Sequence, residues 1–431
     1  MSAESEPQPA ARPTPRGAPE LRRVETVITP EERPTPFGNI WVGVADYADV
    51  HRHGRTHVAA ARGWDTAGLA TLCREPAARA LAPEGWAFLD VESTGLGAHA
   101  GIHAFLIGIG WLVPGGLRIE QFLLRDPSEE PALLHAVGTR LAPFAGLVTF
   151  NGKSFDMPLL ATRAALLRAA PLAPGRTHCD LLHAARRAWG DGPQGCRLGD
   201  LEARLLGFRR SGDLPGRFIP HTYMQYLRDG RGADLDPILT HNRADLVSLA
   251  LLTAAASRFL AAVESEVEIP SRTASHAADQ LRAARLYAQV GEREHASRLL
   301  ERCLAAAPPL DTRQAARGLY ARLCKQAGDF ERACGLWSQM TDDDPSLVEP
   351  VEELAKVDEH RRRDPRAALA WVAQRLGGPS LDVGSRRDLQ YRQARLARRL
   401  AGGLLDPDVP GEACEGPLSR GSGIANLRSP I

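Results

Sequence analysis

Two acidic residues in the segment 85–94, GWAFLDVEST, are spaced so that they could share a cation. Alternating side chains predict a β-strand here, and on a strand Asp90 and Glu92 project from the same face. Such a pair is more often a solvated polar face. The rest of this strand is apolar, however, and burying two acids in it is costly unless a cation or hydrogen-bond donors compensate them. A Ser-Thr-Gly turn at 93–95 follows directly, and its glycine would let the backbone approach a ligand closely.

Two further acidic residues lie far along the chain from this pair. Asp156 follows an apolar strand pattern at 147–150, and it could also be the N-cap of the helix predicted after it. Asp245 lies on a long helical pattern at 237–260, one helical turn after His241. Because positions i and i+4 share a helix face, His241 and Asp245 can address the same point in space.

Four carboxylates with a nearby histidine form a set of hard oxygen ligands, which suits two Mg²⁺ or Mn²⁺ ions better than zinc or iron. The chemistry that this set implies is phosphodiester hydrolysis, in which two cations about 4 Å apart activate a water molecule and stabilise the leaving oxygen. His241 could accept the proton of that water, because an imidazole near its ordinary pKa suits general-base catalysis around neutral pH.

The motifs FLDVESTGL, TFNGKSFDMPLL and HNRADLVSLA resemble the three exonuclease motifs of the DEDD superfamily of 3′–5′ exonucleases, which have a ribonuclease H-like fold. The segments THCDLLHAARRAWG, CRLGDLEARLLG and DLPGRFIPHTYMQYL further resemble the bacterial YprB-type ribonuclease H-like domain, and the resemblance covers roughly residues 37–260. It implies that Asp90, Glu92, Asp156 and Asp245 hold the metal ions and that His241 is the base.

The spacing of the last motif departs from the common pattern. Three residues separate His241 from Asp245, as in the tyrosine subclass, whereas the histidine subclass usually has four. His241 could therefore take the proton, orient the water or merely cap the helix.

Several residues could contact nucleic-acid phosphates. The segment 163–217 has ten arginines and five acidic residues, which fits either a backbone-binding groove or a solvated helical face. Asn-Gly at 151–152 is ordinarily a turn, and Asp180 is best explained as a helix N-cap. The candidates for phosphate contacts are Thr94, Asn151, Lys153, Arg186, Arg187, Arg209 and Arg210. Phe155 and Tyr223 could stack on bases, although core packing is the safer interpretation of Phe155.

The predicted elements must bring these residues together. A three-strand antiparallel meander is followed by alternating helices and strands, which predicts an α/β ribonuclease H-like domain with a mixed sheet flanked by helices over 85–265. The predicted strands are 85–94, 102–113, 117–126 and 147–150, and the predicted helices are 131–141, 157–170, 181–189, 197–206, 221–229 and 237–260.

The segments on either side of this domain differ in character. Residues 1–36 are poor in aliphatic residues and predict a disordered tail, and 401–431 predict a loose C-terminal tail. The segment 37–84 is expected to extend the nuclease domain with a strand or hairpin and a helix near 67–81.

Short amphipathic helices after residue 270 predict an all-α segment over 271–400. Two helix pairs surround glycines 37 residues apart, Gly291 and Gly328, which is close to the period of tetratricopeptide-like repeats. A plain helical bundle fits the periodicity equally well. Acidic patches at 342–344 and 349–353 favour a protein partner for this segment over nucleic acid.

Composition excludes several classes of protein. The 431 residues are 44% hydrophobic and 24% charged with a net charge of +1, which is typical of a globular protein and gives no overall sign of a polyanion partner. Seven scattered cysteines without a C-x-x-C pair favour reduced thiols over disulfides or a zinc site. No apolar run approaches the roughly 20 residues that span a membrane, and the N-terminal segment does not resemble a secretory signal, so we expect a cytoplasmic protein.

The leading hypothesis is therefore a hydrolase, a metal-dependent 3′–5′ exonuclease on single-stranded DNA or RNA with a free 3′ end. Two alternatives stay open: a catalytically inactive nucleic-acid-binding or scaffold protein that works through its helical repeats, and a structure-specific endonuclease.

Overall fold

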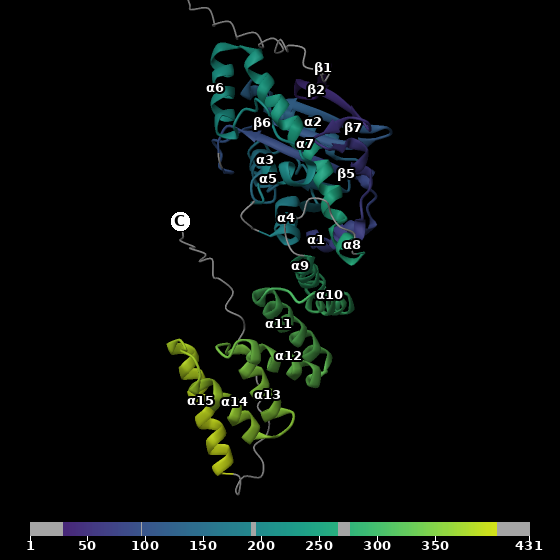
Figure 1. The fold of residues 1–431 in the computed structure, drawn as a ribbon. Helices are drawn as coiled ribbons and strands as arrows, with labels where there is room; N and C mark the ends of the chain where they lie inside the picture. Colours follow the sequence, from purple (N-terminus) through teal and green to yellow (C-terminus); the bar gives the residue numbers. More distant parts are fainter. Residues whose placement is uncertain (1–28, 96, 191–194, 266–275, 403–431) are drawn as a thin grey trace, which may run out of the picture. The chain divides into compact units, whose positions relative to one another are not determined.

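The computed structural model describes residues 29–95, 97–190, 195–265 and 276–402, with the side chains of 233–234 excepted (Figure 1). The chain divides into two compact units between Leu319 and Tyr320.

The first unit is built on a seven-stranded mixed sheet in the order β1-β2-β7-β6-β5-β8-β9. Its strands are β1 Thr29–Thr35, β2 Gly38–Ala48, β5 Trp86–Ser93, β6 Ala104–Val113, β7 Gly116–Leu123, β8 Gly146–Thr149 and β9 Thr177–Asp180. The predicted meander is confirmed, since β5, β6 and β7 pair antiparallel in sequence order. β8 pairs parallel with β5 and β9 parallel with β8, so the sheet is mixed as the sequence predicts.

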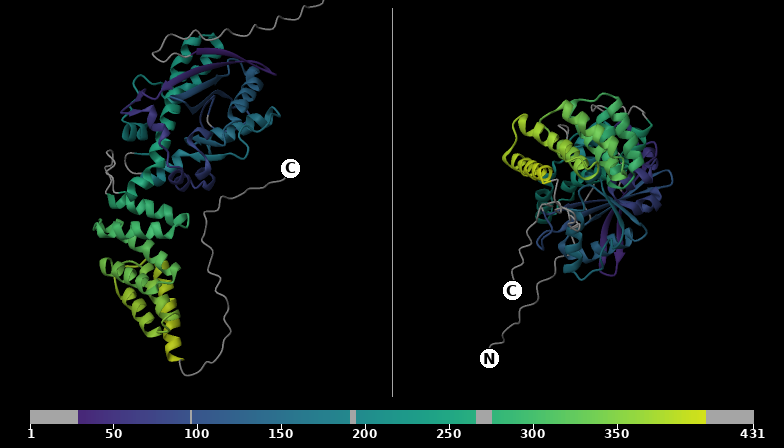
Figure 2. Two further views of the ribbon diagram at one scale, coloured as in Figure 1. Left: turned by 90° about the vertical axis from the view of Figure 1, so that its right-hand side faces the viewer. Right: turned by 90° about the horizontal axis from the view of Figure 1, so that it is seen from below.

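Helices lie on both faces of this sheet (Figures 1 and 2). The helices of the first unit are α1 Thr66–Cys73, α2 Glu130–Leu141, α3 Asp156–Leu166, α4 Leu181–Trp189, α5 Leu198–Leu201, α6 Ile219–Asp229, α7 Asp236–Ser257, α8 Phe259–Glu264, α9 His276–Gln289 and α10 Arg293–Ala305. A small second sheet, β3 Arg52–His53 and β4 Thr56–His57, precedes α1.

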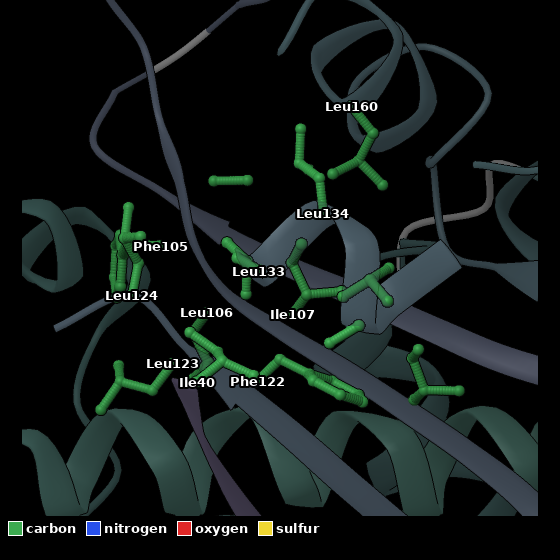
Figure 3. Close-up of a cluster of buried hydrophobic side chains, with 14 of the residues drawn as sticks. Ile40, Phe105, Leu106, Ile107, Phe122, Leu123, Leu124, Leu133, Leu134 and Leu160 are labelled. Carbon is green, nitrogen blue, oxygen red and sulfur yellow. The ribbon is translucent and has the colours of Figure 1, made fainter. Parts of the chain in front are cut away.

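The main core lies between the sheet and the helices α2 and α3. Leu133 and Leu160 from these helices pack with the strand residues Ile107 and Phe122, which are cross-strand partners (Figure 3). The opposite face of β5, β6 and β7 is covered by α7. The face that carries Asp90 therefore packs against the helix that carries Asp245.

The N-terminal part of the sheet corrects the predicted tail. Residues 29–35 form β1, which pairs with β2, although the composition predicted disorder up to residue 36. The reason is a tertiary contact, because Arg33 donates to the buried carboxylate of Glu120 on β7 at 2.6 Å. Residues 1–28 lie outside the described part of the chain.

Three other predictions differ in detail from the structure. The sequence pattern missed β9, a four-residue strand that completes the sheet. The helix predicted at 197–206 is the short α5 followed by a π-helical turn, Glu202–Leu206. The helix predicted near 67–81 is α1 followed by a short 3₁₀ turn at Pro76–Ala80.

The expectation about long apolar runs is wrong for one stretch. Residues 236–264, which form α7 and α8, are long and apolar enough to span a membrane by length and composition. However, 78% of their apolar window is buried inside the protein. This pattern is typical of a core helix, and among the described residues it is weak evidence for a membrane span.

The C-terminal region is helical, as predicted. After α10 the helices are α11 Leu310–Ala327, α12 Phe330–Asp343, α13 Glu349–His360, α14 Pro365–Gly377 and α15 Val383–Ala401. Gly291 and Gly328 end the first helices of two successive pairs with φ angles of +86° and +85°. This left-handed backbone strongly favours glycine, which explains their regular spacing. α15 was not predicted, and its buried residues Leu389 and Leu396 join the core of the second unit.

Candidate active site

The first acidic pair projects from β5 toward α7. Asp90 lies opposite Gly108 of β6, and both Asp90 and Glu92 are partly buried. A Cβ atom at Gly108 would lie only 2.3 Å from Oδ1 of Asn242 and 2.6 Å from Leu246. The glycine therefore lets α7 approach the sheet at the level of Asp90.

Asn242 connects the helix directly to the first acidic residue. Its Nδ2 donates to Oδ2 of Asp90 at 2.8 Å, and its Oδ1 accepts from Nε2 of Gln121 on β7 at 2.8 Å. Asn242 is fully buried, so these hydrogen bonds fix the helix against two strands.

Asp156 is the first residue of α3, immediately after the loop that follows β8. The N-cap of this helix is Phe155, which makes no side-chain capping hydrogen bond, so the N-cap alternative for Asp156 is wrong. A carboxylate of the neighbouring element shapes the loop instead, because Asp180 accepts from the backbone N–H groups of Asn151 at 2.8 Å and Lys153 at 3.0 Å. Asp180 also caps α4 by accepting from Leu182 N, as predicted.

The pKa values of these carboxyl groups reflect burial and mutual repulsion. Burial raises the pKa of Asp90 well above its ordinary value, and the charges of Asp245, Glu92 and Asp156 raise it further. Burial likewise raises the pKa of Glu92 to about 7 and that of Asp156 to about 7. The four carboxyl groups, from three separate elements, thus act electrostatically on one another around Asp90.

Asp245 lies on α7 and is paired with an arginine. Arg210 forms an ion pair with Asp245 and another with Glu202, the latter at 2.6 Å. Burial raises the pKa of Asp245, while Arg210 and His241 oppose this shift. Burial alone would lower the pKa of Arg210, but Glu202 and Asp245 hold it above its ordinary value. Arg210, predicted as a phosphate contact, is thus part of the acidic site itself.

His241 is held by a residue that the sequence analysis did not select. Its Nδ1 lies 2.8 and 2.9 Å from the two carboxylate oxygens of Asp213, and its Nε2 lies 3.6 Å from Oδ2 of Asp245. Nη1 of Arg210, which can only donate, also lies 3.2 Å from Nδ1, but both Asp213 oxygens are closer. Because a carboxylate only accepts hydrogen bonds, these closer contacts favour a proton on Nδ1 and a lone pair on Nε2. The lone pair is therefore on the nitrogen nearer to Asp245.

Buried hydrogen bonds hold Glu202, the carboxylate that pairs with Arg210, in place. Ser248 donates to Glu202 at 2.5 Å, and Nε2 of His53 lies 2.7 Å from the Ser248 hydroxyl. The His53 ring stacks on Phe208 at 3.7 Å, and burial, with smaller effects of His51 and Arg210, lowers the pKa of His53 to about 3. His53 is therefore neutral at physiological pH.

The donor types at this site fit a divalent cation. Carboxylate oxygens are the preferred ligands of Mg²⁺ and Mn²⁺, and the mutual repulsion around Asp90 would be relieved by a bound cation. As they stand, the residues described by the structure include no group of three or more His, Cys, Asp or Glu side chains placed to hold one ion. Asn242 donates to Oδ2 of Asp90 and Arg210 to Oδ1 of Asp245, which leaves lone pairs on the second oxygen of each carboxylate for a cation.

Some of the residues predicted to contact phosphates bond to other groups of the protein, and others are exposed. Thr94 accepts from the backbone N–H of His103 at 3.0 Å, and Lys153 pairs with Glu75 at 2.7 Å. Arg187 donates to the carbonyl of Leu72 at 2.6 Å. Asn151 has a left-handed backbone with φ of +66° in the loop held by Asp180, and Arg186 and Arg209 are exposed.

Core packing of Phe155 and base stacking by Tyr223 were wrong predictions, whereas base stacking by Phe155 stays a prediction. Phe155, next to Asp156, is 46% exposed rather than packed in the core. Tyr223 is buried, stacks on Phe105 at 3.9 Å and donates to the carbonyl of Leu124, so it is not available to bases.

Sequence reasoning missed Asp213, Glu202 and Asn242. Asn242 directly follows His241 in the HNRAD motif, and Asp213 begins the DLPGRFIPHTYMQYL segment, so both were close to recognised patterns. Glu202 lies in the CRLGDLEARLLG segment, but its role depends on the turn that brings it to Arg210.

Comparison with known proteins places the chain in a family. A family model described as the RNase_H superfamily matches residues 87–257, the range that contains the four carboxylates and His241. The chain is also 30% identical over 362 residues to the "uncharacterized protein YprB" of Bacillus subtilis (strain 168), with 82% of this chain and 84% of that protein covered. The chain therefore belongs to the YprB family of proteins with a ribonuclease H-like domain.

Proposed function

We propose that this protein is a metal-dependent nuclease that removes nucleotides from the 3′ end of single-stranded DNA or RNA. Membership of the RNase H superfamily indicates a nuclease. The observation that carries the finer proposal is the set of carboxylates around Asp90, supplied by β5, α3 and α7. The 3′ to 5′ direction is supported by the resemblance of the three acidic motifs to those of DEDD exonucleases.

The residues divide into ligands and a base. Asp90, Glu92, Asp156 and Asp245 would hold two Mg²⁺ or Mn²⁺ ions, which when bound supply an acidified water and neutralise charge on the phosphate. His241 would accept the proton of the attacking water at Nε2, because Nδ1 already donates to Asp213.

Asp213 and the phosphate contacts would position the reacting groups. Asp213 would keep the His241 ring in one orientation and stabilise the imidazolium that forms when the proton arrives. Candidates for the substrate backbone are Thr94, Asn151, Lys153, Arg186, Arg187 and Arg209.

The test is incubation of the purified protein with end-labelled single-stranded DNA and RNA, in Mg²⁺, in Mn²⁺ and in EDTA, beside the variant Asp90→Asn. We expect metal-dependent shortening from the 3′ end in the parent protein and none in the variant. Internal cuts would favour an endonuclease. Intact substrates with persistent binding would favour a protein that binds nucleic acid without cleaving it.

A further inference from the structure

A groove of about 880 Å³ lies in the second unit, outside the site described above. Three helices, α11, α13 and α15, supply most of its wall. Phe330 at the start of α12 and Arg361 directly after α13 complete it. All of its lining residues follow residue 320 and thus belong to one compact unit.

The three glutamates on the α13 side of this groove are in ion pairs, whereas no ion pair of the fourth acidic lining residue, Asp388 on α15, is seen within the described part of the chain. Arg322 pairs with Glu349 at 2.8 Å, and Lys325 pairs with Glu353. Lys356 pairs with Glu353 at 2.8 Å. The patch at 349–353, which suggested a protein partner from the sequence, is therefore largely neutralised.

The α15 wall, lined by Asp388, Tyr391, Arg392 and Arg395, has an excess of positive charge, which Arg399 extends beyond the groove lining. Arg392, Arg395 and Arg399 all approach the single carboxylate of Glu359, at 3.5, 2.5 and 3.4 Å. Glu359 is 2% exposed, whereas the side chains of Arg395 and Arg399 are 42% and 54% exposed. One buried carboxylate cannot use all the donors of three guanidinium groups, so several remain for an external anion.

Two further groups extend this wall into a surface suited to nucleic acid. Arg361 lies in the groove 4.7 Å above the ring of Phe330 and is exposed. Tyr391 is 68% exposed on α15, next to Arg392 and one turn before Arg395. An exposed aromatic ring among arginines matches a strand that offers both phosphates and stackable bases.

We propose that this groove is a second binding site for single-stranded nucleic acid, with Arg361 and Arg395 contacting phosphates and Tyr391 stacking on a base. An acidic peptide would match the charge but would give Tyr391 no comparable partner. The site is independent of the acidic centre, so the proposal does not rest on nuclease activity.

The test measures binding of a fluorescent oligothymidylate of about 30 nucleotides to the full chain by anisotropy, in EDTA and over a series of salt concentrations. The variants are Arg361→Gln with Arg395→Gln, and Tyr391→Ala. The control is Arg363→Gln with Arg366→Gln, which removes the same charge from exposed positions outside the groove lining. Glu359 keeps Arg392 and Arg399 in the first variant, and circular dichroism checks that each variant is folded.

We expect the groove double variant to weaken binding about fivefold or more and to lower the slope of log K against log salt by about 1.4, from roughly 0.7 per lost phosphate contact. Tyr391→Ala should also weaken binding about fivefold or more, and the control much less. Equal weakening by the groove and control variants, or an unchanged affinity of Tyr391→Ala, would overturn the proposal. So would binding of a Glu-rich peptide that depends on Arg361 and Arg395 while oligothymidylate affinity does not.

Discussion

The His241 ring is held by a carboxylate 28 residues earlier in the chain, and this contact makes the role of the ring testable. The close contact with Asp213 favours the proton on Nδ1, which leaves the lone pair on Nε2, the nitrogen nearer to Asp245. The unusual spacing between His241 and Asp245 is compatible with this geometry, since one helical turn already places the two side chains 3.6 Å apart.

We predict that Asp213→Asn lowers kcat roughly tenfold to hundredfold, because the ring loses its orienting charge while the four carboxylates remain. Affinity for Mn²⁺, measured by calorimetry, should change little. Asp229→Asn, the same exchange at an exposed residue at the end of α6, is the control. A kcat equal to that of the control would show that Asp213 does not act on the reaction.

The raised pKa of Asp156 predicts a pH-dependent effect on stability. An acid whose folded pKa is about 7 binds protons more tightly in the folded than in the unfolded state, so its contribution to stability falls as pH rises from about 4 to about 7. Asp156→Asn removes this dependence. Without metal, the variant should gain on the order of 2 kcal/mol relative to the parent at pH 8 and nearly nothing at pH 4, as measured by urea unfolding in EDTA.

Comparison with the parent at each pH is necessary because His53 and His178 act in the opposite direction. Their folded pKa values of about 3 and about 4 lie below that of an unfolded histidine, so the unfolded state binds more protons and stability falls as pH falls below about 6.5. A pH-independent difference between Asp156→Asn and the parent would contradict the electrostatic coupling of the site.

The stabilisation of the fold by a divalent cation should increase as the pH rises. Because Mg²⁺ or Mn²⁺ competes with protons for Glu92 and Asp156, either ion should raise the unfolding temperature of the protein more at pH 8 than at pH 6. Thermal unfolding with and without the ion measures this, and Asp90→Asn should show a much smaller shift. Equal shifts in Asp90→Asn and the parent would place the bound ion elsewhere.

At the scale of the elements, the site depends on how closely α7 approaches the sheet. The helix packs on β5, β6 and β7, and at Gly108 its side chains Asn242 and Leu246 occupy the space that a Cβ atom would need. Asn242 then ties Asp90 to the helix that carries His241 and Asp245.

Gly108→Ala should therefore disturb the site through the helix. The added methyl group would overlap Asn242, so we expect a loss of about 1–3 kcal/mol in unfolding free energy together with weaker metal binding. Gly110→Ala is a close control, because a Cβ atom at Gly110 of the same strand meets its nearest neighbours at an ordinary 3.6 Å. Equal losses in the two variants, by urea unfolding and calorimetry, would mean that this approach of α7 is not critical.

At the scale of the whole molecule, the chain combines two compact units with separate cores. The core of the first unit includes Leu133 on α2, and the core of the second unit includes Leu389 on α15. Two units of this kind need not unfold in one transition.

We expect Leu389→Ala to destabilise the second unit by about 2–5 kcal/mol, because a fully buried side chain leaves a cavity, without reducing turnover of a short oligonucleotide. Leu133→Ala, made in the first core, should lower both stability and the stabilisation by Mg²⁺. Calorimetric unfolding with and without Mg²⁺ compares them. Loss of turnover in Leu389→Ala under conditions where the protein is folded would contradict this separation.

The local patterns of this protein can be recognised without its fold. Alternation predicted β5, β6, β7 and β8, helical periodicity predicted α7, and glycine spacing predicted the first helix pairs, because each depends on residues that are near neighbours in the chain. The same patterns located Asp90, Glu92, Asp156 and Asp245, since acids in otherwise apolar segments stand out.

Only the tertiary structure decided which groups surround those acids. β1 and β9 form because a sheet edge is available to pair with, and their own residues carry little signal. Asp213 and Arg210 reach His241 and Asp245 through an irregular segment whose path depends on packing. Hydrogen bonds and ion pairs between residues far apart in the chain have no periodic pattern, so they become visible only when the fold brings the partners together.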